Sequence, residues 1–140
     1  MPRLLGVDLG TRRIGLAVSD PTGTIAQPHG ILDRSGDPAA DRAAVLAAAR
    51  AVGATRIVVG WPRSLSGRDG PAARAARAET EALRGDAGPD LPVDLHDERF
   101  STATAQRARR ASGARRGARR RPVDDLAAAV ILQSYLESRR

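Results

Sequence analysis

The sequence contains no cysteine, which excludes disulfides, thiolate metal sites and a cysteine nucleophile. Its two histidines cannot by themselves form a zinc-finger ligand set. One Trp, one Tyr and one Phe are present, so domains that stack several bases on exposed rings are disfavoured. No apolar run approaches the length of a membrane-spanning helix. These absences predict a soluble protein of the cytoplasm with no membrane partner.

Lysine is absent as well, so every strongly basic side chain is an arginine. The 23 arginines exceed the 16 acidic residues and give a formal net charge of +7, which indicates a polyanionic partner such as nucleic acid. The guanidinium fork matches phosphate geometry, although a base-composition bias of the genome would equally explain the choice of arginine over lysine. We expect a mobile basic segment at 113–121 that contacts phosphates, with an idle solvated charge run as the alternative. The arginines of this part of the chain are Arg107, Arg109, Arg110, Arg115, Arg116, Arg119, Arg120 and Arg121.

Hydrophobic periodicity and turn residues predict an alternation of strands and helices. The first three strands are joined by tight turns, whereas helices separate the later ones. This order predicts an α/β fold in which an antiparallel meander leads into right-handed crossover units, with helices flanking a mixed sheet. The length of 140 residues predicts one domain over 1–140. Strands are expected at 3–9, 13–19, 24–32, 56–60 and 92–97, and helices at 38–52, 71–84, 102–112 and 122–138.

Carboxylates occur at three places where chemistry could use them. Asp8 interrupts the first apolar strand, where a charge is costly unless it is paired with an arginine or bound to a metal. Glu98 follows the strand 92–97, at the kind of strand end where α/β sheets bind ligands, although a solvated strand end has the same sequence pattern. Asp124 and Asp125 lie in the first turn of the last helix, where complementing the helix dipole suffices for at least one of them.

Four segments of the chain occur in a defined order and spacing: GVDLGTRRIGLAVSDP, VVGWPRSLSGRDGPAA, HDERFST and PVDDLAAAVILQSYLE. They resemble the YqgF family of ribonuclease H-like nucleases, whose members are described as Holliday junction resolvases or pre-16S ribosomal RNA nucleases. The resemblance extends from residue 4 to about residue 137. It implies a five-stranded mixed sheet of strand order 3-2-1-4-5 flanked by helices. That arrangement agrees with the element order predicted from periodicity.

The motif positions imply that Asp8, Glu98 and Asp124 are the catalytic acids, with Asp125 as the alternative to Asp124. Carboxylates gathered from distant elements repel one another, and Mg²⁺ or Mn²⁺ relieves the repulsion because these ions prefer oxygen ligands. The same three acids are therefore the expected metal ligands, holding two ions, with water as the nucleophile. The expected nucleic-acid contacts are Arg12, Arg115, Arg116, Arg119 and Arg120.

The function implied by the resemblance is a metal-dependent nuclease, a hydrolase that trims the 5′ end of pre-16S ribosomal RNA. RNA, in a pre-ribosomal particle, is the preferred partner. The first alternative is a Holliday junction resolvase, for which a homodimer with two sites on a two-fold axis would be suited, so monomer and homodimer both stay open. A non-catalytic module that binds RNA or the ribosome is the second. The segment DLGT also resembles a phosphate motif of two-lobed ATPases, but 140 residues supply one such lobe.

Other side chains near these motifs have structural interpretations that we prefer. His96 is expected on the opposite strand face from Asp97, packed rather than shuttling protons. His29 is expected at the surface, and Trp61 is expected to pack under a loop rather than stack on a nucleotide. Gly60 is expected to serve backbone geometry or the substrate side.

Overall fold

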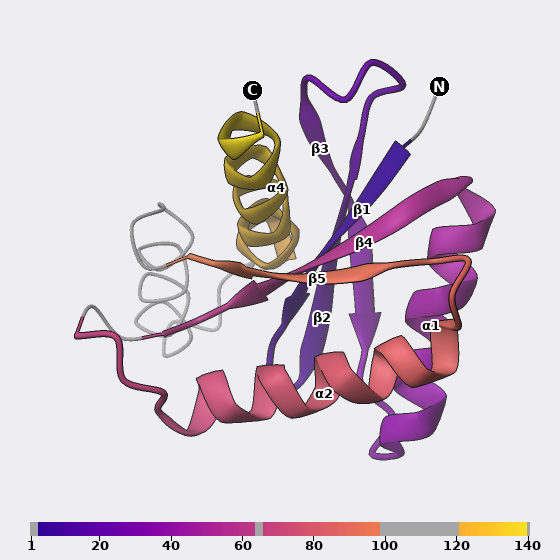
Figure 1. The fold of residues 1–140 in the computed structure, drawn as a ribbon. Coiled ribbons are helices and arrows are strands. Elements are labelled where there is room, and N and C mark those ends of the chain that lie inside the picture. The colour runs from indigo at the N-terminus through magenta and orange to yellow at the C-terminus, as the bar shows by residue number, and fades with distance from the viewer. Residues whose placement is uncertain (1–2, 64–65, 99–120, 140) are drawn as a thin grey trace.

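Five strands form one mixed sheet in the order β3-β2-β1-β4-β5 (Figure 1). In this computed structural model residues 3–63, 66–98 and 121–139 are described, with backbone only for 121–125. β1, β2 and β3 form the antiparallel meander, and β4 and β5 run parallel to β1, which confirms the predicted order. The elements are β1 (Arg3–Leu9), β2 (Arg13–Ser19), β3 (Ala26–Asp33), α1 (Pro38–Ala51), β4 (Ala54–Trp61), α2 (Pro71–Ala87), β5 (Val93–Asp97) and α4 (Arg121–Ser138).

The helix ends differ slightly from those predicted. α2 continues to Ala87 instead of ending at 84, because the first strong stop signal is Gly88, whose φ of 78° favours glycine. α4 begins at Arg121, so Pro122 lies within its first turn instead of opening the helix. The predicted helix 102–112 and the basic segment from 113 to 120 lie outside the described residues. None of the described helices is both long and apolar enough to cross a bilayer.

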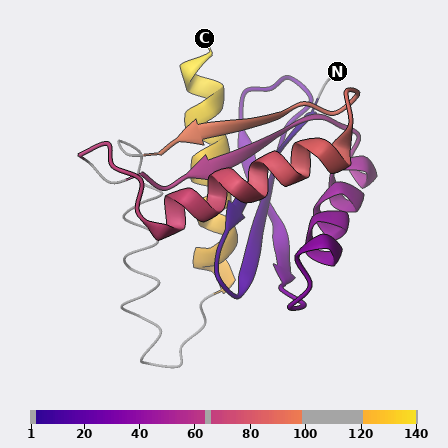
Figure 2. The same cartoon turned by 60° about the horizontal axis from the view of Figure 1, so that its bottom comes forward.

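Helices cover both faces of the sheet. α1 and α2 lie on one face and α4 lies on the other, as Figure 2 shows from a second direction. Strand alternation sends side chains of β1, β2 and β4 into two separate cores. The core under α1 and α2 includes Leu5, Val7, Ile14, Leu16, Val45, Leu46, Ile57, Val59 and Leu83. The core under α4 includes Ala17, Val58, Ala128, Ile131, Leu132, Tyr135 and Leu136.

α4 approaches β1 closely because Gly6 has no side chain. A Cβ atom built on Gly6 would lie 2.8 Å from Cβ of Leu132 and 3.1 Å from the carbonyl oxygen of Ala128. Real side chains do not approach this closely, so any larger residue would push the helix away from the strand. Gly6 therefore sets the distance between the sheet and the middle of α4.

Candidate active site

Asp8 lies on the α4 face of β1. Its neighbours Val7 and Leu5 alternate with it and belong to the core on the opposite face. The carboxylate residue is almost completely buried, with 1% of its surface exposed. After Leu9 the chain turns sharply, since the N–H of Gly10 donates to the carbonyl oxygens of Asp8 at 3.1 Å and Arg13 at 3.0 Å. The tight turn thus fixes the strand end on which Asp8 lies.

Glu98 directly follows β5 and is fully buried, with 0% of its surface exposed. Its backbone N–H donates to the carbonyl oxygen of Trp61 at 3.2 Å, which holds this residue against the end of β4. A Cβ atom on Gly60 would overlap Oε2 of Glu98 and would lie 2.5 Å from Cδ1 of Ile131. The absence of a side chain at Gly60 therefore creates the space that the Glu98 carboxylate occupies.

The strand register brings Asp8 and Glu98 to the two sides of Gly60. Val7 pairs with Val59 across β1 and β4, so the next residues along each strand, Asp8 and Gly60, are also neighbours. Gly60 pairs in turn with His96 of β5, two residues before Glu98. Since side chains alternate along a strand, all of these positions lie on the face that α4 covers. The structure thus places two buried carboxylates at one end of that face, as the sequence predicts.

The first turn of α4 lies at the same end of the sheet. Along the helix in the reverse direction, Tyr135 bonds to Asp94, Ser134 lies against His96, and Ile131 contacts Gly60. The N-terminal turn, 121–125, therefore extends toward the carboxyl ends of β1 and β5. Asp124 and Asp125 belong to this turn, and their side chains are outside the described part of the molecule. Within the described part, no three His, Asp or Glu side chains form a group able to hold a metal ion.

His96 packs between β5 and α4. Its Nε2 lies 3.0 Å from Oγ of Ser134, and its ring meets that of Tyr135 edge to face at 5.6 Å. Burial lowers the pKa of His96, opposed in part by the charge of Asp97, so the neutral ring is favoured. These contacts agree with the predicted packing role. The nearby carboxylate of Asp94 accepts hydrogen bonds from the Tyr135 hydroxyl at 2.6 Å and from Arg56 of β4 at 2.9 Å.

Arg34 holds the turn between β1 and β2, a role that the sequence motifs do not indicate. Its Nε donates to the carbonyl oxygen of Gly10 at 2.7 Å, and its backbone N–H donates to that of Arg12 at 2.8 Å. Its two terminal nitrogens donate to the two carboxylate oxygens of Glu79 in α2, at 2.9 and 3.2 Å. Arg12 itself is exposed at this turn, as expected of a phosphate contact. The other predicted contacts, Arg115, Arg116, Arg119 and Arg120, lie outside the described residues.

Replacing Arg34 with Gln is expected to lower the free energy of unfolding by about 1–3 kcal/mol, because it breaks a charge-assisted bidentate pair. Both side chains are only 19% exposed, so solvent screens the pair weakly. Urea denaturation of Arg34→Gln, Glu79→Gln and the double variant measures the coupling. Additive losses in this cycle would show that the pair does not stabilise the turn.

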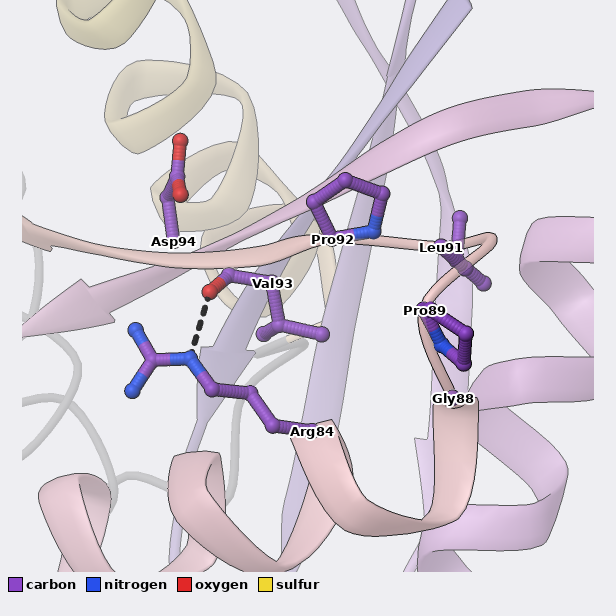
Figure 3. Close-up of a pocket in the computed structure, with 7 residues that line it drawn as sticks. All are labelled: Arg84, Gly88, Pro89, Leu91, Pro92, Val93 and Asp94. Carbon is purple, nitrogen blue, oxygen red and sulfur yellow. Dashed lines mark hydrogen bonds between the residues drawn. The ribbon is translucent and has the colours of Figure 1, made fainter.

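One surface hollow in the described part of the molecule lies away from these acids. It has a volume of about 570 Å³ and is lined by Arg84, Gly88, Pro89, Leu91, Pro92, Val93 and Asp94. Figure 3 shows that these residues surround the connection from α2 into β5, where Nε of Arg84 donates to the carbonyl oxygen of Val93 at 2.8 Å. The hollow is therefore at the start of β5, whereas Glu98 follows its end. None of its lining residues is a predicted site residue.

Solved structures with similar folds include Holliday junction resolvases. Thermus thermophilus RuvC in complex with a Holliday junction substrate superposes with a TM-score of 0.56 and 17% identity, covering 99% of this chain and 96% of that one. The fowlpox virus resolvase in complex with Holliday junction DNA gives a TM-score of 0.57 at 11% identity, with 97% of each chain covered. At these identities the similarity establishes the fold, which confirms the predicted ribonuclease H-like class.

Curated relatives with the provisional name pre-16S rRNA nuclease are more similar in sequence. A protein of Kineococcus radiotolerans is 46% identical over 137 residues, covering 97% of this chain and 72% of the relative. A protein of Geobacillus kaustophilus is 44% identical over 141 residues, covering 99% of both chains. The profile of the RuvX family, described as Holliday junction resolvases, matches residues 2–138. RuvX is another name for the YqgF family, so the predicted resemblance is confirmed. The chain belongs to the RuvX family.

Proposed function

We propose that this protein is a metal-dependent nuclease whose catalytic acids are Asp8, Glu98 and Asp124. The observation that supports this most strongly is the pair of buried carboxylates, Asp8 and Glu98, on either side of Gly60. Burying two acids at one sheet end is costly unless an opposite charge compensates them. The first turn of α4, which includes Asp124, extends toward the same end and supplies a third carboxylate. We treat the whole of 1–140 as one catalytic domain.

The donor set fits Mg²⁺ or Mn²⁺, since it consists of carboxylate oxygens and contains no sulfur. The proposed ligands are Asp8, Glu98 and Asp124, and the three acids suffice for two ions. Bound ions would supply an activated water and neutralise the charge that develops on the phosphate. The space left by Gly60 lets the Glu98 carboxylate lie over β4, the strand between β5 and the strand of Asp8.

The remaining roles belong to arginines and to water. Arg12 is exposed on the turn that follows Asp8, where its guanidinium group can bind a phosphate next to the scissile bond. Arg115, Arg116, Arg119 and Arg120 precede α4 in the sequence and would bind the backbone farther from the cut. Water is the attacking group, so the reaction consumes one water and leaves one phosphomonoester and one hydroxyl end.

The substrate we favour is the 5′ end of pre-16S ribosomal RNA, in a pre-ribosomal particle in the cytoplasm. The names of the relatives that are 44–46% identical support this choice. The family description and the resolvase structures support a second candidate, cleavage of four-way DNA junctions. Symmetric junction cleavage requires two active sites, whereas trimming one RNA end requires a single site. A monomer is therefore compatible with the first function, and the second requires a homodimer.

Cleavage assays on both substrates test this proposal. The purified protein is incubated with precursor 16S RNA, free and in isolated pre-ribosomal particles, and with a synthetic four-way DNA junction, in Mg²⁺, Mn²⁺ or EDTA. We expect metal-dependent cutting of the RNA at its precursor end. Cutting of the junction alone would establish the resolvase function instead. If none of the substrates is cut and the RNA is bound equally well in EDTA, the chain is a binding module.

A further inference from the structure

The last residue of β4, Trp61, supports two arginines that follow it in the chain. The guanidinium carbon of Arg63 lies 4.4 Å from the centre of the indole ring, and that of Arg77, in α2, lies 4.8 Å from it. Guanidinium groups bind favourably over an indole face. Because two such groups lie over this ring, Trp61 serves as a support for arginines and not as a stacking surface for bases. This agrees with the packing role predicted for it.

Asp69 forms ion pairs with both arginines, Arg63 and Arg77. Its Oδ1 lies 3.1 Å from Nε of Arg63, and its Oδ2 accepts from a terminal nitrogen of Arg77 at 2.6 Å. Arg74 donates to the backbone carbonyl oxygen of Asp69 at 2.8 Å. We call these four residues with Trp61 the arginine cluster. Each guanidinium group is held in a defined position before any partner binds, which lowers the entropy cost of binding.

The arginine cluster is positively charged and accessible. Three arginines face one aspartate within it, and Asp97 adds one further negative charge at 3.7 Å from Arg63. The side chain of Arg77 is 52% exposed, whereas that of Asp69 is only 18% exposed. The guanidinium group therefore reaches solvent while its counter-ion is largely covered. The first turn of α2 contains no acidic residue, so Asp69, directly before the N-cap Gly70, is the one carboxylate of the cluster at the positive end of this helix dipole.

The cluster lies at the same end of the sheet as the proposed acid site but on the α2 face, because the side chain of Trp61 alternates with Gly60 and points away from α4. The carbonyl oxygen of Trp61 accepts the backbone N–H of Glu98, and Trp61 pairs with Asp97 across the two strands. In Figures 1 and 2 the connection from β4 to α2 lies at the end toward which the arrowheads of β4 and β5 point. Arg12 lies on the β1–β2 turn, so Asp8 is between this arginine and the strands β4 and β5. A nucleic acid strand crossing the acids could thus meet guanidinium groups on both sides.

We infer that the arginine cluster binds the phosphodiester backbone of the substrate on the β5 side of the acids, with Arg77 as its main contact. The inference rests on the proposed nuclease function and adds a surface that positions the strand. A guanidinium fork that already uses one edge for Asp69 still presents further N–H donors to a phosphate oxygen. Such contacts are independent of sequence, so they set affinity and register rather than base preference.

Binding measurements on Arg77→Gln test the inference. The probe is a fluorescently labelled RNA with the precursor 5′ end of 16S rRNA, and a four-way DNA junction is a second probe. All proteins also have the Asp8→Asn substitution, so that the probe stays intact. The matched control is Arg50→Gln, which removes one exposed charge from the last turn of α1, just before β4 begins and so at the other end of that strand from Trp61. Anisotropy is measured over a series of salt concentrations.

We expect Arg77→Gln to weaken binding several-fold and to reduce the slope of log K against log salt by about one. Arg50→Gln should leave both quantities unchanged, and Arg77→Lys should restore the salt slope because it keeps the charge. An unchanged melting temperature of Arg77→Gln would show that the overall fold is retained. Equal affinity of Arg77→Gln and Arg50→Gln would overturn the inference.

The outcomes separate the inference from the function on which it rests. If the wild-type protein cleaves RNA and Arg77→Gln binds it normally, the cluster has only a structural role and the nuclease function stands. Binding that depends on Arg77 in a protein that never cleaves would support the cluster and overturn the nuclease. A protein that binds neither probe would overturn both. A loss restricted to the junction probe would assign the surface to branched DNA.

Discussion

Asp8→Asn should reduce metal-dependent cleavage by at least about 10²-fold, the scale typical of losing one electrostatic contribution to a transition state. Asn keeps the size of the side chain but removes the charge that a divalent ion requires. The position is 1% exposed and lies beside Gly60, so water cannot take over the role of the lost oxygen without rearrangement. The rate is measured under single-turnover conditions on precursor 16S RNA in Mg²⁺ and in Mn²⁺.

The same substitution should leave the fold intact. Asn has nearly the same shape as Asp, so the packing around this buried position is preserved and Asp8→Asn is expected to unfold in urea as a cooperative, folded protein in EDTA. Asp33→Asn is the matched control, because that carboxylate is 83% exposed and forms only a loose, solvent-screened pair with Arg13 at 3.5 Å. It should keep the wild-type rate. Full cleavage by Asp8→Asn would contradict the assignment of Asp8.

Gly60→Ala should abolish cleavage even though it changes no charged residue. The new methyl group would overlap Oε2 of Glu98 and would lie 2.5 Å from Cδ1 of Ile131. Either the carboxylate of Glu98 leaves its position beside Asp8, or α4 moves outward and takes Asp124 away from both acids. The expected loss of stability is about 1–3 kcal/mol, as for other overpacked sites. Single-turnover rates and Mn²⁺ affinity by calorimetry report the damage to the acids.

Gly6→Ala distinguishes damage to the acids from a general loss of packing. Its methyl group would press on Leu132, 2.8 Å away, and would push α4 from β1 without touching Glu98. We expect a similar loss of stability but a smaller loss of Mn²⁺ affinity. Gly85→Ala, in the last turn of α2, would meet no atom within 4 Å and should be neutral or stabilising by up to about 1 kcal/mol. Wild-type Mn²⁺ affinity in Gly60→Ala would show that Glu98 is not a metal ligand.

Local sequence patterns sufficed for the sheet and, together with the family resemblance, for the two buried acids. The strands predicted at 3–9 and 13–19 have the bounds found in β1 and β2, because tight turns delimit both. Asp8 stood out because a charge within an apolar strand is unusual, whereas Glu98 was indicated by its place at a strand end and assigned through the family resemblance. The end of α2 was placed too early because residues 85–87 contain no stop signal as strong as Gly88.

Contacts between distant residues could not be predicted in this way. Arg34 and Glu79 are separated by 45 positions, and neither belongs to a motif that suggests a partner. The role of Gly60 becomes visible only when the positions of Glu98 and Ile131 are known. The cluster around Trp61 likewise depends on how the loop after β4 folds back onto α2. Tertiary packing determines these features, and periodicity does not encode it.

The proposed acid site is tested most directly by the single-turnover cleavage rate of Glu98→Gln compared with that of Asp97→Asn. The two acids are adjacent at the end of β5, but strand alternation places them on opposite faces, and only Glu98 lies on the face of Asp8 and Gly60. Glu98→Gln should lose cleavage of precursor 16S RNA by at least about 10²-fold. Asp97→Asn should stay within a few-fold of the wild-type rate. Normal cleavage by Glu98→Gln, with or without an effect of Asp97→Asn, would contradict a nuclease site built on Asp8, Glu98 and Asp124.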